Sequence, residues 1–318
     1  MRNNRKQSIL FGNGLNRLNT DNPSWDDLIK DIAKDAIDHN IPNTLKYEAI
    51  ILKEPYREVA LLAVSDGSLM VTSGGSSIGV QGDVVEEKLK KDIAERLKSF
   101  ESNLIYDKIA NLPADHYITT NYDNTLFKAK GPSAIDMHYR QEKLYSIRRH
   151  YTFNVKYGRQ QYWPMHGNVD SPKSIMLGFD HYCGALSKVE SYVKGGYEMP
   201  EIGRLESMTN RLKKGIDEIY SWIDLFFISD VHIIGQQLAY EEMDLWWVLN
   251  KRRRIKQRDK NLIDNRIVLY PVSELTEDKK QLLKGFDVEI VEMDNYTDDF
   301  PTKYDIQLGK MQKMMQST

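Results

Sequence analysis

Short apolar runs that stop at polar or glycine turns recur along the chain, and they predict buried β-strands. Each run is rich in β-branched or aromatic residues and is too short for an ordinary helix. The runs are "SILFG" at 8–12, "HYITTNYD" at 116–123, "FFISDVHIIG" at 226–235, "RIVLYPV" at 266–272 and "FDVEIVEMD" at 286–294.

Longer stretches of mixed charge between these runs carry apolar residues at helical spacing. They are "PSWDDLIKDIAKDAI" at 23–37, where Ser24 is a candidate N-cap, "VVEEKLKKDIAERLKSF" at 84–100 and "ESMTNRLKKGIDEIYSWI" at 206–223. Strands that alternate with helices predict an α/β fold whose parallel, Rossmann-like sheet has helices on both faces. Ligands of such sheets bind at the carboxyl ends of the strands.

We expect one domain spanning residues 1–318, with a largely helical insertion at about 25–108, after the first strand, and a second helical insert at about 180–222. The tract "TSGGSSIGVQGD" at 72–83 is rich in glycine and serine. No Lys-Ser or Lys-Thr follows it, so a phosphate-binding loop of the Walker type is disfavoured. A flexible surface loop is the better interpretation.

Composition narrows the class of protein. The chain has 44 basic and 46 acidic residues, so its net charge of −2 gives no overall field for a nucleic acid or an anionic membrane. The basic run "KRRRIKQRDK" at 251–260 is most simply the solvated end of a helix. The single cysteine, Cys183, excludes intrachain disulfides and zinc sites built from several thiolates. With no membrane-length apolar run and no signal-peptide core, we expect a cytoplasmic protein.

Three stretches carry the candidate chemistry, and the first two follow predicted strands. The first strand ends in Gly12-Asn13-Gly14, where backbone amides can approach a phosphate, although Arg17 stands where the dinucleotide fingerprint has a third glycine. Taken alone, this motif is as well explained by a bare turn. Asn121 and Asp123 follow a later strand, and His166 precedes a glycine in "QYWPMHGNVD". Each has an ordinary structural explanation as well, as a helix cap or a core residue.

Taken together and in order, these stretches resemble the sirtuin-like fold. The family's Gly-Ala-Gly, Thr-Gln-Asn-X-Asp and His-Gly motifs are matched by Gly-Asn-Gly, "TTNYD" at 119–123 and His166-Gly167. "IIGQQLAYEEMDLWWVL" at 233–249 is similar to the following glycine turn, and the resemblance covers about 9–294. "SIMLGFDHYCGAL" at 174–186 resembles the same segment of bacterial sirtuin-like domains used in antiphage defence.

The sequence also departs from the family pattern. Asn13 replaces the alanine of Gly-Ala-Gly, and Thr120 stands where the family has glutamine. One cysteine cannot build the four-cysteine zinc module of the lysine deacylases. The resemblance therefore implies the branch that cleaves NAD+ to nicotinamide and ADP-ribose, with NAD as substrate, no metal and no lysine deacylase activity.

The resemblance also implies a role for each matching residue. Asn121 would hold the ribose hydroxyls and the attacking water, and Asp123 would bind the nicotinamide amide or hold Asn121 from behind. His166 would act as general base on a ribose hydroxyl or on the water. The implied NAD-binding residues are Gly12, Asn13, Gly14, Thr120, Gly235 and Gln236, with Arg17 as a candidate phosphate contact.

Regulation follows from the same resemblance, because an unrestrained NAD hydrolase would drain its own cell. We expect a closed resting state, opened by homo-oligomerisation or by a partner such as an ATPase or a phage-derived activator, in an abortive-infection defence system. Trp246 and Trp247 are candidates for a subunit face, although burial in the core is their simpler explanation. The alternatives are a non-hydrolytic sensor of NAD or ADP-ribose and a subunit that depends on a partner.

Overall fold

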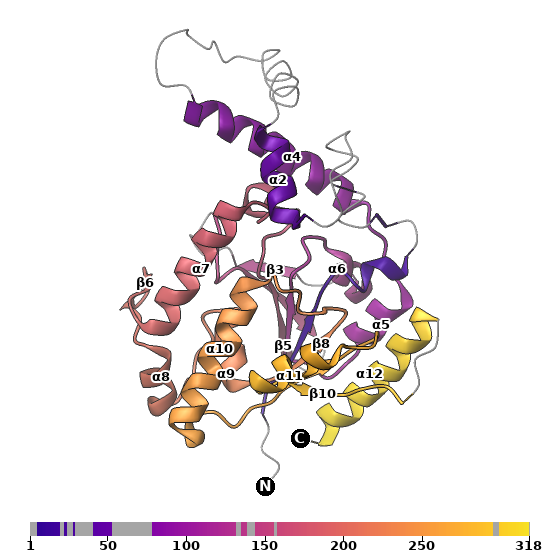
Figure 1. Cartoon of the computed structure of the whole chain (residues 1–318), viewed down its shortest axis with the longest axis vertical. Coiled ribbons are helices and arrows are strands. Elements are labelled where there is room, and N and C mark those ends of the chain that lie inside the picture. Colours follow the sequence, from indigo (N-terminus) through magenta and orange to yellow (C-terminus); the bar gives the residue numbers. More distant parts are fainter. Residues whose placement is uncertain are drawn as a thin grey trace.

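A central eight-stranded sheet organises the chain (Figure 1). The computed structural model describes residues 5–19, 22–23, 28, 41–52, 78–131, 135–138, 144–155, 158–294 and 299–317. The strand order is β10-β9-β8-β1-β2-β5-β4-β3. From β10 to β5 the neighbouring strands pair in parallel, whereas β4 and β3 extend the sheet with antiparallel pairs. The strands are β1 (Gln7–Phe11), β2 (His116–Thr119), β3 (Ile135–His138), β4 (His150–Val155), β5 (Gly158–Pro164), β8 (Asp230–Ile234), β9 (Ile267–Tyr270) and β10 (Glu289–Ile290).

Helices pack on both faces of this sheet, because alternate strand residues point to opposite sides. Leu10 of β1 joins a core cluster that contains residues of α7 (Phe179–Lys194), α9 (Trp222–Ile228), α10 (Met243–Arg258) and α11 (Glu277–Gly285). Ile9 and Phe11 join a second cluster with α5 (Leu104–Ala110), α6 (Thr125–Lys130) and α12 (Phe300–Ser317). The predicted α/β fold with a mostly parallel, helix-covered sheet is confirmed.

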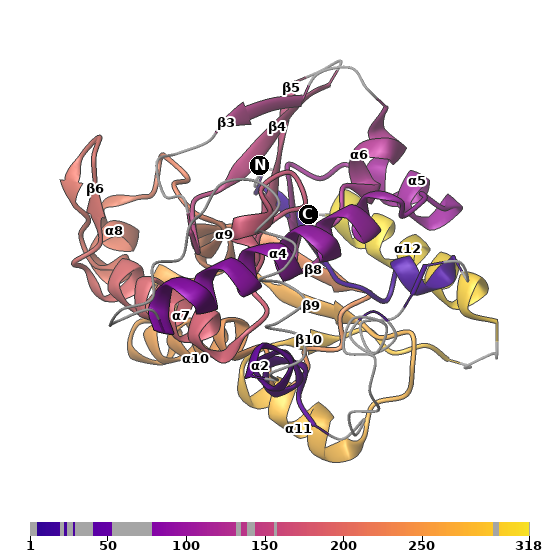
Figure 2. The same ribbon diagram turned by 90° about the horizontal axis from the view of Figure 1, so that it is seen from above.

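A third layer lies over the carboxyl ends of the strands (Figures 1 and 2). It is formed by α2 (Asn43–Leu52) and α4 (Ile78–Lys98), whose apolar side chains pack with Tyr122, Val169 and Leu177. The described part of 25–108 thus consists of α2, α4 and α5. The described residues of 180–222 include α7, α8 (Met208–Lys214) and a hairpin of β6 (Glu198–Met199) and β7 (Gly203–Arg204). Leu28 apart, the helix predicted at 24–37 lies outside the described residues.

Several predicted elements were wrong in extent. Residues 226–228 end helix α9 and do not belong to a strand, because short apolar runs fit a buried helix equally well. The helix predicted at 206–223 is broken at Gly215, which caps α8 with φ +86°. Residues 72–77 of the tract rich in glycine and serine lie outside the described residues. Residues 78–83 begin α4, where a loop was expected. Glycine in a helix costs about 1 kcal/mol, which a long helix can tolerate.

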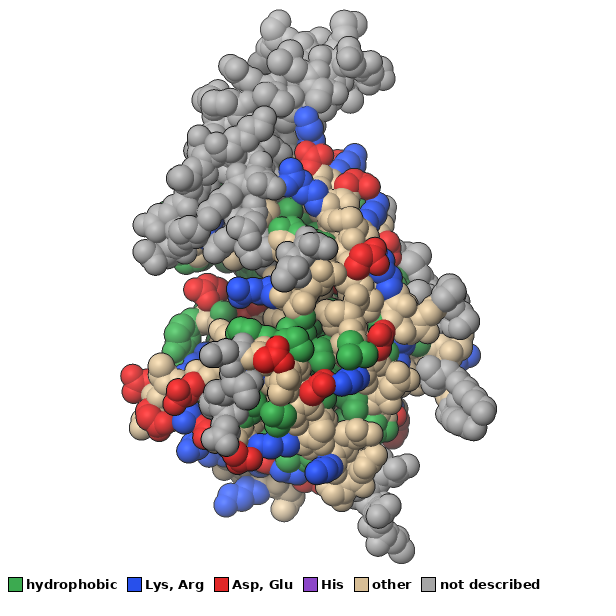
Figure 3. All heavy atoms as spheres, turned by 90° about the vertical axis from the view of Figure 1, so that its right-hand side faces the viewer, with side chains coloured by type: hydrophobic (Ala, Val, Ile, Leu, Met, Phe, Trp, Pro, Cys, Tyr) green, Lys and Arg blue, Asp and Glu red, His purple; other side chains and the backbone are tan. Residues whose placement is uncertain are grey.

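Among the described residues, the face of the molecule in Figure 3 shows no large patch of a single sign of charge. On the face drawn in Figure 3, acidic and basic side chains are interspersed. The basic run at 251–260 is partly used inside the fold and is not wholly solvated as expected: Arg252 is buried and pairs with Asp287 at 2.7 Å. In the part of the chain that the structure describes, no helix has both the length and the apolar character needed to cross a membrane.

Candidate active site

The motif residues meet at the carboxyl edge of the sheet, where the strand order reverses beside β1. This is the position at which open α/β sheets bind ligands. A cavity of about 360 Å³ lies there. It is lined by residues from the loops after β1, β2, β5 and β8, namely Asn13, Thr120, Asn121, His166 and Gln236.

The glycines of the first motif let two loops approach closely. Gly14 donates its amide to the carbonyl oxygen of Gly235 at 3.0 Å, and a Cβ on Gly14 would lie 2.7 Å from that same oxygen. Gly235 has φ +65°, a conformation that favours glycine. The three glycines set the position of the loops, while Asn13 between them faces the cavity. Their predicted phosphate contacts stay predictions.

A buried chain of hydrogen bonds fixes Asn121 from behind. Asn121 Nδ2 donates to the hydroxyl of Tyr106 at 3.3 Å, and that hydroxyl donates to Asn16 Oδ1 at 2.7 Å. Asn16 Nδ2 in turn donates to Asp123 Oδ2 at 2.7 Å. The other oxygen of Asp123 accepts from the amide of Thr125 at the start of α6. Asp123 does not line the cavity, and both of its expected roles stay predictions.

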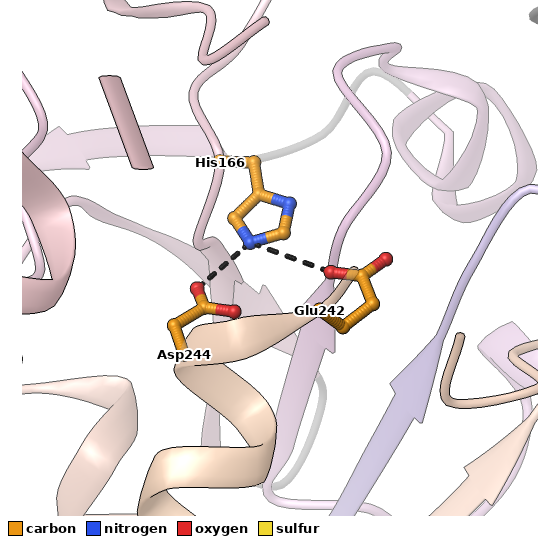
Figure 4. A group of neighbouring side chains, drawn as sticks. All are labelled: His166, Glu242 and Asp244. Carbon is orange, nitrogen blue, oxygen red and sulfur yellow. Dashed lines mark hydrogen bonds and ion pairs between the residues drawn. The ribbon is translucent and has the colours of Figure 1, made fainter. Parts of the chain in front are cut away.

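His166 lies between two carboxylates from the segment that begins α10 (Figure 4). Its Nε2 is 2.9 Å from Asp244 Oδ2 and 3.8 Å from Glu242 Oε2. The edge of the Tyr182 ring, with centroids 5.2 Å apart, covers the imidazole. Because a carboxylate can only accept, the contact with Asp244 places a proton on Nε2.

Burial and charge act in opposite directions on this group. Burial lowers the pKa of His166, but the Asp244 charge and hydrogen bond, with help from Glu242, outweigh it and leave the pKa above its usual value. Burial raises the pKa of Glu242, opposed by the neighbouring His166 and reinforced by Asp244. Shifted acid–base groups in a cavity are typical of functional sites.

The same three side chains have the spacing of a small metal-binding group, since their ligand atoms lie within 4.8 Å of one another. A ligating histidine nitrogen must be free of its proton. In the described structure Nε2 bonds to Asp244, so a metal ion bound at this nitrogen would have to replace that proton.

Other predicted contacts differ in how close they come to the cavity. Gln236 Nε2 donates to Thr120 Oγ1 at 3.2 Å and to Glu242 Oε1 at 3.1 Å, which joins the β2 and β8 loops to the acidic segment. Arg17 is exposed on a short 3₁₀ helix (Asn16–Leu18) and does not line the cavity. Trp246 and Trp247 are half-buried against the core, where the Trp246 ring packs on Phe286.

Helices α2 and α4 form the roof of the cavity. Tyr47 and Ile50 of α2 line it together with Leu89 and Ile93 of α4. Lys46 of α2 is the one cation among the described lining residues, and it is buried.

Three polar side chains, Glu86, Lys90 and His181, connect the α4 part of the roof to α7. His181 Nε2 lies 2.5 Å from Glu86 Oε1, and Lys90 Nζ is 2.7 Å from the same oxygen. Burial opposes ionisation of Glu86, but His181 and Lys90 outweigh it and lower its pKa to about 2. His181 Nδ1 accepts two backbone amides at the start of α7, from Leu177 and Gly178.

Sequence reasoning missed several of these groups. Glu242 and Asp244 belong to an acidic stretch directly after the glycine turn, and that placement after a strand was the available signal. Tyr106 and Lys46 carry no such signal, because only the fold brings α5 and α2 next to the strand ends.

Residues 115–198 match the family model of the SIR2-like domain. The matched segment runs from β2 to the start of the β6–β7 hairpin and includes Asn121, Asp123 and His166, while the loops after β1 and β8 lie outside it. A search of curated proteins finds no significant match. SIR2-like domains use NAD as substrate. The match over residues 115–198 and the fold both support a sirtuin-like domain family.

Proposed function

We propose that the chain is an NAD+ glycohydrolase that releases nicotinamide and ADP-ribose. The observation that carries this proposal is the single cavity at the strand ends, in which Asn121 and His166 face the same space as Asn13, Thr120 and Gln236. Every motif of the sirtuin-like pattern contributes a lining residue to it. A substrate bound across the β1 loop would therefore reach both the amide and the imidazole.

Cleavage of the bond to nicotinamide requires mainly that the substrate is positioned and that developing charge is stabilised. The nicotinamide ring of NAD+ is a cationic pyridinium and leaves as a neutral molecule, so the transition state has positive charge on the ribose. Glu242, beside His166 in the cavity wall, would stabilise that charge at close range. Asn121, held by Tyr106, would bind the ribose hydroxyls with its remaining amide atoms.

The test is release of nicotinamide from NAD+ by the purified chain, followed by chromatography. Wild-type protein should release it, and His166→Ala should lower the rate by at least ~100-fold, the lower range for loss of a general base. Cys183→Ser, at an exposed position on α7, serves as the control and should keep the wild-type rate. Binding of NAD+ without release of nicotinamide would replace the enzyme with the sensor alternative.

The biological role is part of the same proposal. We propose an effector of abortive infection whose activity depends on assembly or on a protein partner. Light scattering over a concentration series, run beside the NAD+ assay, tests this dependence. Specific activity should fall as the protein dissociates, and constant activity in the monomer would contradict control by assembly.

A further inference from the structure

We infer that Glu242 is a second catalytic residue of this cavity, whose Oε2 atom accepts the proton of the water that attacks the ribose. The inference rests on the proposed NAD+ cleavage and names the group that activates water within it. Glu242 lies outside the segment that matches the SIR2-like domain, in the acidic stretch after the glycine turn.

The two oxygens of Glu242 have different surroundings. Oε1 accepts from Gln236 Nε2 at 3.1 Å, and this bond fixes the carboxylate in the cavity wall. Oε2 is buried, and among the described residues it has no hydrogen-bond partner. A buried carboxylate oxygen without a partner is costly, so such an atom calls for a ligand or a functional explanation.

His166 is less free to accept a proton on the side that faces Glu242. Its Nε2 is occupied by the hydrogen bond to Asp244, and in Figure 4 the dashed lines to both carboxylates start from this nitrogen. At the junction of the three side chains, the free acceptor is therefore Oε2 of Glu242. His166 lies close enough, at 3.8 Å, to influence the ionisation of that carboxylate.

The surroundings of Glu242 raise its pKa above the usual value for a glutamate. Burial raises its pKa, His166 lowers it, and Asp244 and Glu241 raise it. Among the described residues, Tyr122 from the β2 loop and Tyr182 from α7 are further ionisable groups that face it. A general base is most effective when its pKa is close to the working pH.

The reaction step balances without a further reagent. The bond between the anomeric carbon and nicotinamide breaks, and its electron pair leaves with nicotinamide, which becomes neutral. The water oxygen bonds to the anomeric carbon of ADP-ribose, and one water proton moves to Glu242 Oε2. Solvent then removes that proton to regenerate the carboxylate.

Glu242→Gln tests the role, because glutamine keeps an oxygen acceptor for Gln236 but cannot take a proton. We expect kcat for NAD+ to fall by about 100-fold with little change in KM. Glu242→Asp keeps a carboxylate and should retain more activity. Glu95→Gln is the control, since Glu95 is an exposed glutamate of α4 that pairs with Lys98 and does not line the cavity; its rate should stay within about threefold of wild type.

Azide separates activation of water from a structural role. It attacks the anomeric carbon without losing a proton, so sodium azide should restore nicotinamide release by Glu242→Gln and yield azido-ADP-ribose. The wild-type rate should fall at acidic pH as Glu242 is protonated, and the variant should lack that dependence. If wild-type protein cleaves NAD+ and Glu242→Gln keeps full activity, the inference is wrong but the proposed function stands. The same holds if Glu242→Gln loses activity that azide does not restore. Absence of nicotinamide release from wild-type protein under all assembly conditions would overturn the proposed function and this inference together.

Discussion

His166 and Asp244 are joined by a 2.9 Å hydrogen bond between the loop after β5 and the first turn of α10. The bond fixes the proton on Nε2 and supplies the negative charge that raises the pKa of His166. It also connects the segment that matches the SIR2-like domain to a helix beyond it.

Asp244→Asn should lower the free energy of unfolding, by an amount that depends on pH. The pKa of His166 is higher in the folded protein than its usual value of about 6.5, so its stabilising contribution is complete below that pH and disappears as pH rises through the folded pKa. We expect a loss of about 1–3 kcal/mol in the free energy of unfolding at pH 5.5 and a smaller loss at pH 8.5. Urea denaturation at both values measures this, and an equal loss at the two would contradict the assignment.

Tyr106→Phe should impair NAD+ cleavage although Tyr106 does not line the cavity. Loss of the hydroxyl leaves Asn121 Nδ2 and Asn16 Oδ1 without this partner, so Asn121 is no longer held in one orientation. We expect a cost of about 1–3 kcal/mol in stability. Tyr117→Phe, which loses another buried hydroxyl bonded to Ile109, is the control. Equal kcat and KM for NAD+ in the two variants would show that the chain from Asp123 to Asn121 has only a structural role.

Gly14→Ala should destabilise the protein, whereas Gly309→Ala should not. A Cβ on Gly14 would lie 2.7 Å from both the Gly235 carbonyl oxygen and the Tyr304 hydroxyl. Overpacking of this kind costs about 1–3 kcal/mol. Gly309 lies within α12 with nothing within 4 Å of a new Cβ, and alanine there should stabilise the helix by up to about 1 kcal/mol. Thermal unfolding of both variants checks the contrast.

Chelation should leave NAD+ cleavage unchanged. The proton on His166 Nε2 occupies the position that a metal ion would need, and Asp244 already accepts it. The assay is nicotinamide release after exhaustive dialysis against EDTA, paired with elemental analysis of the protein. A stoichiometric metal lost together with activity would assign His166, Glu242 and Asp244 to a metal site.

Glu86→Gln should loosen the roof of the cavity. The Glu86 pKa is lowered to about 2 from 4.5, so its stabilising contribution is present above about pH 4.5 and is lost as pH falls through about 2. At neutral pH the variant should show faster hydrogen exchange in α4 than wild type. Glu95→Gln is the control on the same helix, because Glu95 is exposed and pairs only with nearby Lys98 in the described structure. Equal protection of α4 in both variants would remove Glu86 from this role.

Local patterns were sufficient for the elements whose signal is contained in a few consecutive residues. The runs around Ile9, Ile118 and Val268 became β1, β2 and β9, and the amphipathic stretch at 84–100 became most of α4. They were also sufficient to place Asn121 after a strand, whereas β5, which precedes His166, was not predicted. The antiparallel extension β3–β4 was not foreseen, because pairing direction is a property of two strands and not of either sequence alone.

The side chains that surround the motif residues are brought there by the tertiary structure. Asp244 is 78 positions from His166 along the chain, and the two meet because β5 and β8 lie on opposite sides of the β1–β2 pair with α10 beginning above them. Tyr106 reaches Asn121 only because α5 packs on the same sheet face as α6. Sequence spacing encodes local conformation, whereas the distance between side chains on different elements depends on strand order and packing. The sequence therefore determined the fold class and the motif residues, and the tertiary structure decided which carboxylates, hydroxyls and helices surround them.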